Sequence, residues 1–140
     1  MMDINFDLRE LTQFEKKILD LATKKMPKQS KQFMRKEGSK LTKKTKAKAK
    51  SEVKKRSGGY HKSIKRGKVY NYNGALAIRC YSTSRRAHLI EKGHRLIVHG
   101  QEKGFVQGKR VFEKAEKEFQ GEFYKDTQKF IDDMLEKGLN

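Results

Sequence analysis

Apolar residues recur with helical spacing near both ends of the chain. In the N-terminal segment they are three or four residues apart, which places them on one face of a helix. These positions are Leu8, Leu11, Phe14, Ile18 and Leu21. Asp7 is positioned to cap this helix, and Pro27 either ends it or lies in the first turn of the next helix. The same spacing from Phe112 to Met134 predicts a C-terminal helix roughly 40 Å long, in which Gly121 indicates a bend or a close packing contact.

Residues 28–56, between these two helices, lack a clear apolar period. Large apolar side chains are few there, whereas lysine and alanine, which favour helices, are frequent. We therefore expect the segment to be frayed by itself in water, and to become helical once its charges are neutralised or a neighbour packs on it. Gly38 and the glycines at 58 and 59 are the expected breaks.

An alternation typical of strands begins after these glycines. Leu76, Ile78 and Cys80 alternate with residues of the opposite face, and an Asn-Gly dipeptide precedes them. The pattern predicts an antiparallel hairpin at residues 69–82 with a two-residue turn. Because Cys80 shares the apolar face, we expect it to be a buried small side chain rather than a nucleophile.

The chain after the hairpin predicts a short helix and a third strand. Ser84 can cap a helix that Gly93 ends, and residues 95–98 form the strand. Glycines at 100, 104 and 108 indicate a flexible loop before the C-terminal helix.

These elements together predict one α+β domain over residues 1–140. Its parts are an N-terminal helix, a basic and partly helical segment, a small antiparallel sheet with the hairpin at 69–82, and a long C-terminal helix. A length of 140 residues, or 16.4 kDa, suits one ordinary domain. The single cysteine excludes an intramolecular disulfide and is typical of a cytosolic protein, and we expect neither a secretion signal nor a membrane span.

Positive charge is concentrated in one part of the chain. Charged residues make up 37% of the sequence and hydrophobic residues 34%, and the net charge is +18. Residues 24–68 contain 19 of the 35 lysines and arginines and only two acids, a net charge of +17. The other 95 residues carry 16 basic and 15 acidic side chains, a net charge of +1. The sequence is therefore a near-neutral domain interrupted by a basic insert at about residues 24–68.

The basic insert has three interpretations: a nucleic-acid surface, a surface for an acidic protein, and a solvated face without a specific partner. Solubility alone does not require the charge to be confined to one window, so we favour contact with a polyanion. Such contacts would go to phosphates, independently of sequence and with strong sensitivity to salt. The residues that we expect to face DNA are Lys40, Lys43, Lys44, Lys46, Lys48, Lys50, Lys54, Lys55 and Arg56.

Candidate catalytic and metal-ligating residues follow no established motif. The four histidines and Glu91 match no metalloenzyme spacing. A nuclease or toxin site at His88, Glu91 and His94 would lack the clustered carboxylates that hold magnesium. Residues 104–110 have only three residues between their glycines, and arginine replaces the serine or threonine of a phosphate-binding loop. We therefore expect no enzyme activity, metal or cofactor, and we expect Glu91 to pair with a nearby arginine. The candidate partners of Glu91 are Arg85, Arg86 and Arg95.

Three short motifs follow one another from residue 57 onward. The first comprises Ser57, Gly58, Tyr60 and Ser63. The second comprises Ala87, His88, Leu89, Ile90, Glu91, Gly93 and His94. The third, at the entry to the last helix, comprises Lys109, Arg110, Val111, Phe112, Glu113, Lys114 and Ala115. In this order the chain resembles the gene ten product-like family of neck, or tail-completion, proteins of long-tailed double-stranded DNA phages. Tyrosine stands at position 60 where the family usually has leucine, and no proline precedes the last helix.

The resemblance implies a structural α+β subunit of the virion that forms a homo-oligomeric ring at the head-tail interface. It implies portal, adaptor or stopper rings and a tail-terminator ring as neighbours, double-stranded DNA in a central channel, and synthesis in the cytoplasm of a bacterial host. The motif residues are structural landmarks of the family without chemistry of their own. The alternative is a free, sequence-independent nucleic-acid-binding protein whose basic segment folds on binding. Oligomeric state distinguishes the two.

Overall fold

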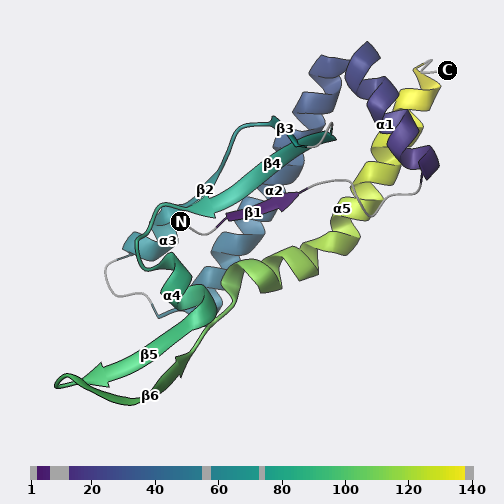
Figure 1. Ribbon diagram of the computed structural model, residues 1–140. Coiled ribbons are helices and arrows are strands. Elements are labelled where there is room, and N and C mark those ends of the chain that lie inside the picture. The colour runs from purple at the N-terminus through teal and green to yellow at the C-terminus, as the bar shows by residue number, and fades with distance from the viewer. Residues whose placement is uncertain (1–2, 7–12, 55–57, 73–74, 138–140) are drawn as a thin grey trace.

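The computed structural model is α+β and describes residues 3–6, 13–54, 58–72 and 75–137 (Figure 1). The predicted fold class is confirmed. The helices are α1 (Gln13–Lys25), α2 (Pro27–Glu52), α3 (Gly59–Ser63), α4 (Ala87–Lys92) and α5 (Val111–Glu136). The strands are β1 (Asp3–Phe6), β2 (Ile64–Arg66), β3 (Tyr70–Tyr72), β4 (Ala75–Ser82), β5 (Gly93–Val98) and β6 (Gln101–Gln107).

Strand β4 is the centre of the main antiparallel sheet. β1 pairs with it along one edge, and β2 and β3 pair with it along the other. The pairing of Tyr72 with Ala75 closes the β3–β4 hairpin, as the sequence predicts. The two turn residues between these strands lie outside the described part of the chain. β1 is an element that the sequence analysis did not predict, and the expected cap at Asp7 also lies outside the described residues.

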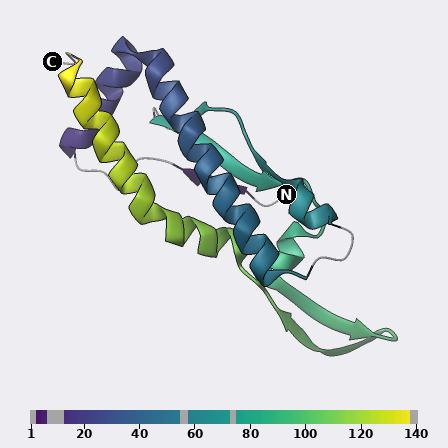
Figure 2. The ribbon, with the colours of Figure 1, turned by 180° about the vertical axis from the view of Figure 1, so that it is seen from behind.

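Helix α2 covers one face of this sheet, and α5 runs beside α2 and contacts β1 (Figures 1 and 2). The core between these elements combines side chains from both helices and from β4. Its fully buried members include Met34, Leu41, Ile64, Ile78, Cys80, Phe112 and Phe119. The prediction that Cys80 is a buried small side chain is confirmed, and burial raises the pKa of its thiol.

Helix α2 agrees with the second condition predicted for residues 28–56, because it is one helix of 26 residues on which α5 and β4 of the same chain pack. Pro27 is its first residue, which settles the two alternatives for that position. The helix passes through Gly38, so the expected break there is wrong. Its buried face is made mainly of small residues, and this is why the apolar pattern is weak. The buried positions are Ser30, Met34, Glu37, Gly38, Leu41, Thr42, Thr45 and Ala49.

Small residues let α2 approach the sheet closely at Gly38. A Cβ atom at this position would lie 2.6 Å from Ile78 Cδ1, closer than carbon atoms approach without displacement. The buried hydroxyls of Thr42 and Thr45 donate hydrogen bonds to backbone carbonyl oxygens four residues earlier, each at 2.8 Å. Both threonines therefore pack as small side chains with their polar atoms already satisfied.

Helix α5 confirms the predicted C-terminal helix, and it curves along its length in both views (Figures 1 and 2). Gly121 is exposed, and a Cβ atom there would meet nothing within 4 Å. Of the two alternatives for this glycine, the close packing contact is therefore wrong.

Strands β5 and β6 form a second, two-stranded sheet that projects from the body of the molecule (Figure 1). β5 includes the predicted strand at 95–98, but β6 occupies the region predicted as a flexible loop, and that prediction is wrong. Glycines close the base of this hairpin. A Cβ at Gly93 would lie 2.4 Å from the carbonyl oxygen of Val106, and one at Gly108 would lie 2.4 Å from that of Glu91.

Candidate nucleic-acid interface

Helix α2 carries ten of the basic residues of the insert, and beyond the exposed Lys28 and Lys31 near its start its packing separates two groups of lysines. One group lies along the edge that faces α5, and the other lies on the exposed side. We call the second group the outer lysine row. It consists of Lys36, Lys43, Lys46 and Lys50.

The lysines beside α5 pair with its acidic residues. Lys40 Nζ lies 2.7 Å from Asp126 Oδ2 and 3.9 Å from Glu122 Oε1. Lys48 Nζ lies 2.7 Å from Glu118 Oε1. Lys40 and Lys48 are each paired with an acid of the same chain. They therefore contribute less free charge than their positions in the sequence suggest.

The hydrogen bond to Asp126 raises the pKa of Lys40, and the hydrogen bond from Lys48 lowers the pKa of Glu118. At neutral pH Lys40 and Glu118 therefore remain charged. Positive charge along the edge between α2 and α5 is thus neutralised by acids of α5. Lys44 beside this edge is half-buried.

Glu37 adds a buried acid to the same edge. It is 1% exposed, and its Oε2 lies 4.0 Å from Lys40 Nζ. Burial is the main cause that raises the pKa of Glu37 to about 8; Asp126 adds to the increase and Lys40 opposes it. Burial also acts to raise the pKa of Asp126, but the adjoining Glu37 and Lys40 lower it overall. Glu37 is therefore mostly protonated at neutral pH while Asp126 is ionised, which reduces the repulsion between them.

The outer lysine row has no ion-pair partner among the described residues, and all four of its side chains are exposed. Lys36, Lys43 and Lys50 follow one another every seven residues, which places them on one side of the helix. Lys54, just beyond the helix, is also exposed, whereas Lys55 and Arg56 lie outside the described residues. Lys36 was not among the residues expected to face DNA; its seven-residue spacing is the signal that could have found it.

The landmark residues lie at the end of the molecule where α2 ends, around α3, α4 and the start of α5 (Figure 1). Gly58 has a positive φ of 81° before α3, and the Ser63 hydroxyl lies 2.6 Å from that of Ser82 on β4. Ala87, Phe112 and Ala115 are buried. Leu89 is 37% exposed, and Gly93 ends α4 as predicted. Ser84 lies near α4, accepting a hydrogen bond from the backbone N–H of Arg86, but the helix itself begins at Ala87.

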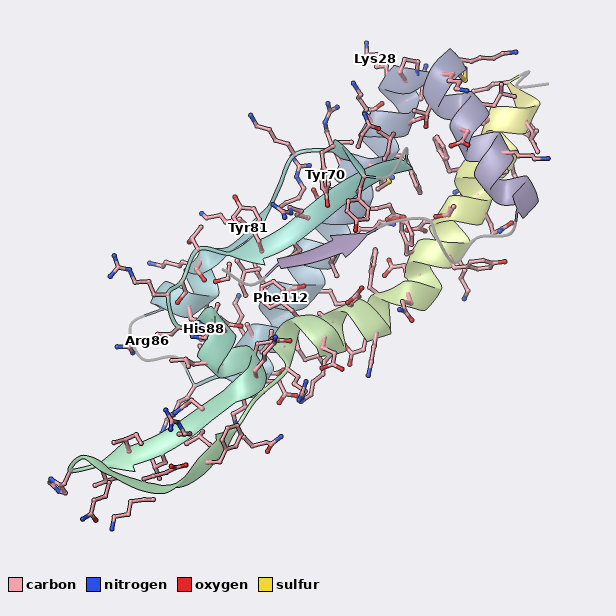
Figure 3. All side chains as sticks on the ribbon, viewed as in Figure 1. Lys28, Tyr70, Tyr81, Arg86, His88 and Phe112 are labelled. Carbon is pink, nitrogen blue, oxygen red and sulfur yellow. The ribbon has the colours of Figure 1, made fainter. Side chains whose placement is uncertain are left out.

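Glu91 joins α4 to the beginning of α5. Its Oε1 accepts a hydrogen bond from the backbone N–H of Phe112, and its Oε2 accepts one from that of Glu113, each at 3.0 Å. The side chain is 5% exposed, and Phe112 beside it is buried (Figure 3). The structural role expected for Glu91 is therefore observed, but the expected arginine partner is wrong. The carboxylate instead caps the first N–H groups of a helix 20 residues later.

The histidines are dispersed over several elements. His61 Nε2 lies 3.2 Å from the carbonyl oxygen of Ala49 and 3.1 Å from that of Val53, so its N–H donates to the last turn of α2. His94 Nδ1 lies 3.0 Å from the carbonyl oxygen of Arg95. In the part of the chain that the structure describes, no three histidine, cysteine or acidic side chains gather in a way that could hold a metal ion.

No protein-family model, curated protein or solved structure matches this chain. Over the described residues, no helix combines the length and the apolar character needed to cross a membrane.

Proposed function

We propose that this protein is a structural subunit of the neck between the head and tail of a double-stranded DNA phage or prophage. Copies would form a ring in the virion around the DNA channel, between portal, adaptor or stopper rings on one side and a tail-terminator ring on the other. The observation that carries contact with DNA is the outer lysine row, a set of exposed cations on a packed helix without an ion-pair partner among the described residues. The exposed apolar side chains of the β5–β6 hairpin carry the assembly into a ring.

The geometry of the row suits a phosphate backbone. Lys36 and Lys50 are 14 residues apart, or about 21 Å along the helix axis. Successive lysines at seven-residue spacing are about 10 Å apart along that axis, close to the Debye length of about 8 Å at physiological salt. Their mutual repulsion is therefore screened in the free protein, while each can neutralise a phosphate of its own. Lysine ammonium groups contacting phosphates read no base sequence, which permits DNA to slide.

The projecting hairpin supports assembly with other copies or neighbouring proteins. Its large apolar side chains are between 38% and 60% exposed. They are Leu96, Ile97, Val98, Phe105 and Val106. A two-stranded hairpin is marginally stable by itself in water, and exposed apolar surface of this kind usually marks an interaction site. An assembling subunit explains the hairpin better than a free monomeric DNA-binding protein does.

The packing of α2 also bears on the alternative function. A segment that folds only on nucleic acid needs no core of its own, whereas α2 buries Met34, Leu41 and Ala49 against the sheet and α5. The outer lysine row serves either function, so the oligomeric state remains the distinguishing measurement.

The decisive experiment removes the outer lysine row and compares it with an equal loss of charge elsewhere. The test variant replaces the four lysines of the row with glutamine. The control variant replaces four exposed lysines away from it, namely Lys92, Lys103, Lys125 and Lys129. Binding to duplex DNA is measured against salt concentration, and particle size is measured by electron microscopy and native mass spectrometry.

The row variant should form the same assemblies, but its log-log salt slope should flatten by roughly 3–4, since each lost phosphate contact contributes about 0.9. The control variant should keep most of the slope. If both variants lose the slope equally, net charge rather than the row binds DNA. If the wild-type protein is monomeric at all concentrations and binds DNA tightly, the free DNA-binding alternative replaces the ring subunit.

A further inference from the structure

A pocket of about 610 Å³ lies where the end of α2, α3, α4 and the base of the β5–β6 hairpin meet. Its volume is within the range of ligand-binding cavities. Val53 and Lys54 contribute from the end of α2, and Leu89 and Ile90 from α4. The pocket belongs neither to the outer lysine row nor to the capping contact of Glu91.

The charged side chains that line this pocket all have the same sign. Lys54, Arg85, Arg86 and Lys109 line it, each of them is exposed, and the lining contains no aspartate or glutamate. None of the four has an ion pair with a described residue. Arg86 extends away from the ribbon beside α4 in Figure 3. Four unneutralised cations around one concave site favour an anionic occupant.

The two histidines of the pocket are engaged elsewhere. His61 donates to the last turn of α2, and His94 bonds the backbone of its neighbour. The anion-binding capacity of the pocket therefore comes from its lysines and arginines.

Apart from its histidines, Ser84 and Gln107, the rest of the pocket is mainly apolar. Val53, Tyr60 and Ile90 are half-buried, and Leu89 and Val106 are 37% and 38% exposed. Apolar side chains on a concave surface gain free energy when an apolar group of a ligand removes them from water. The occupant should therefore carry an apolar group next to its negative charges.

We propose that this pocket binds an acidic segment of another protein, in which aspartates or glutamates contact Arg85, Arg86, Lys54 and Lys109 and one apolar side chain packs on Leu89 and Val106. A phosphodiester backbone offers the negative charge but no apolar side chain, so nucleic acid satisfies only half of the site. A second copy of this chain is a poor source, because its net charge is +18. The proposal concerns a different surface from the outer lysine row and does not depend on it.

The test uses the full-length protein and three fluorescent probes: a short glutamate-rich peptide that contains leucine, the same peptide with serine in place of leucine, and a short DNA duplex. The pocket variant is Arg86→Glu with Lys109→Glu, and a second variant, Leu89→Ser, changes no charge. Circular dichroism confirms that each variant is folded. The glutamine variant of the outer lysine row is the matched control.

The wild-type protein should bind the leucine peptide at least several-fold more tightly than the serine peptide. The charge variant should lose roughly tenfold or more in peptide affinity, and Leu89→Ser should remove the preference for leucine. Both should keep the DNA affinity that the row variant loses. If the two peptides bind equally, no apolar side chain packs in the pocket and the proposal is overturned. If the pocket variants lose DNA affinity and keep peptide affinity, the pocket is a nucleic-acid site and the proposal is likewise overturned. No peptide binding by the folded wild type also overturns it, without bearing on the outer lysine row.

Discussion

Replacing Glu91 with alanine should destabilise the protein strongly, although Glu91 has no counter-ion among the residues that the structure describes. Its two carboxylate oxygens accept hydrogen bonds from the backbone N–H groups of Phe112 and Glu113, the second and third residues of α5. The N-cap residue of α5, Arg110, has a positive φ of 50° and supplies no side-chain cap of its own. The beginning of a 26-residue helix therefore depends on a side chain from α4.

The expected loss follows from the number and burial of these contacts. Glu91 is 5% exposed, so its truncation to alanine leaves two N–H donors without an acceptor at a buried position. An unsatisfied buried donor costs about 1–3 kcal/mol, and a lost N-cap typically costs about 1 kcal/mol. Water can reach part of the opened site, so we expect Glu91→Ala to lower the free energy of unfolding by about 2–4 kcal/mol. Glu91→Gln keeps one acceptor oxygen but loses the charge that favours a helix N-terminus, and it should lose about 1–2 kcal/mol.

Urea denaturation followed by circular dichroism measures both losses. The control is Glu113→Gln, which removes an acid from the same helical turn. The hydrogen bonds from Arg110 and Lys117 lower the pKa of Glu113, but these contacts are exposed, so the denaturation midpoint should hardly change. An alanine variant at position 91 within about 0.5 kcal/mol of the wild type would refute the capping role, since even a single lost cap costs more. Loss of a measurable turnover with the fold intact would instead indicate chemistry at Glu91.

Three further measurements test the interior. The pKa of Glu37 is raised from 4.5 to about 8, so between these pH values the folded state binds more protons than the unfolded state. The stability of the protein should therefore fall as pH rises through this window. Glu37→Gln should flatten this fall, as measured by thermal denaturation at several pH values. In urea titrations, Gly38→Ala should lower the free energy of unfolding by about 1–3 kcal/mol, and by less in an Ile78→Val background that removes the clashing Cδ1. Gly121→Ala has open space around it and should raise the free energy of unfolding by up to about 1 kcal/mol. Cys80 should resist an aromatic disulfide reagent in the folded protein and react at full rate in denaturant; rapid reaction under native conditions would contradict its burial.

Elements with a strong local pattern could be predicted from the sequence alone. The apolar spacing of α5 and the alternation of Leu76, Ile78 and Cys80 reflect which positions are buried, and the structure confirms both elements. Gly93 ends α4 because a positive φ there, 88°, suits glycine. The concentration of positive charge in residues 24–68 is likewise a property of the sequence, independent of folding.

Elements whose stability depends on distant residues could not be predicted in this way. β1 and β6 exist through pairing with β4 and β5, and backbone pairing leaves only a weak trace in side-chain pattern. Glu91 finds its partner more than twenty positions away because the chain turns back at the hairpin, whereas nearby arginines were the natural expectation from sequence.

The sequence by itself determined that the protein is α+β, that its longest apolar helix is C-terminal and that one segment holds nearly all of the net charge. Only the tertiary structure decided that this basic segment is a packed helix. Its buried face consists mainly of small residues such as Gly38, which gives no apolar pattern in the sequence but lets the helix approach Ile78 closely. Only the tertiary structure also separated Lys40, paired with Asp126, from Lys43 on the open side. The charge of a lysine is fixed by its chemistry, but its freedom to bind a partner depends on which acids the fold brings within a few ångströms.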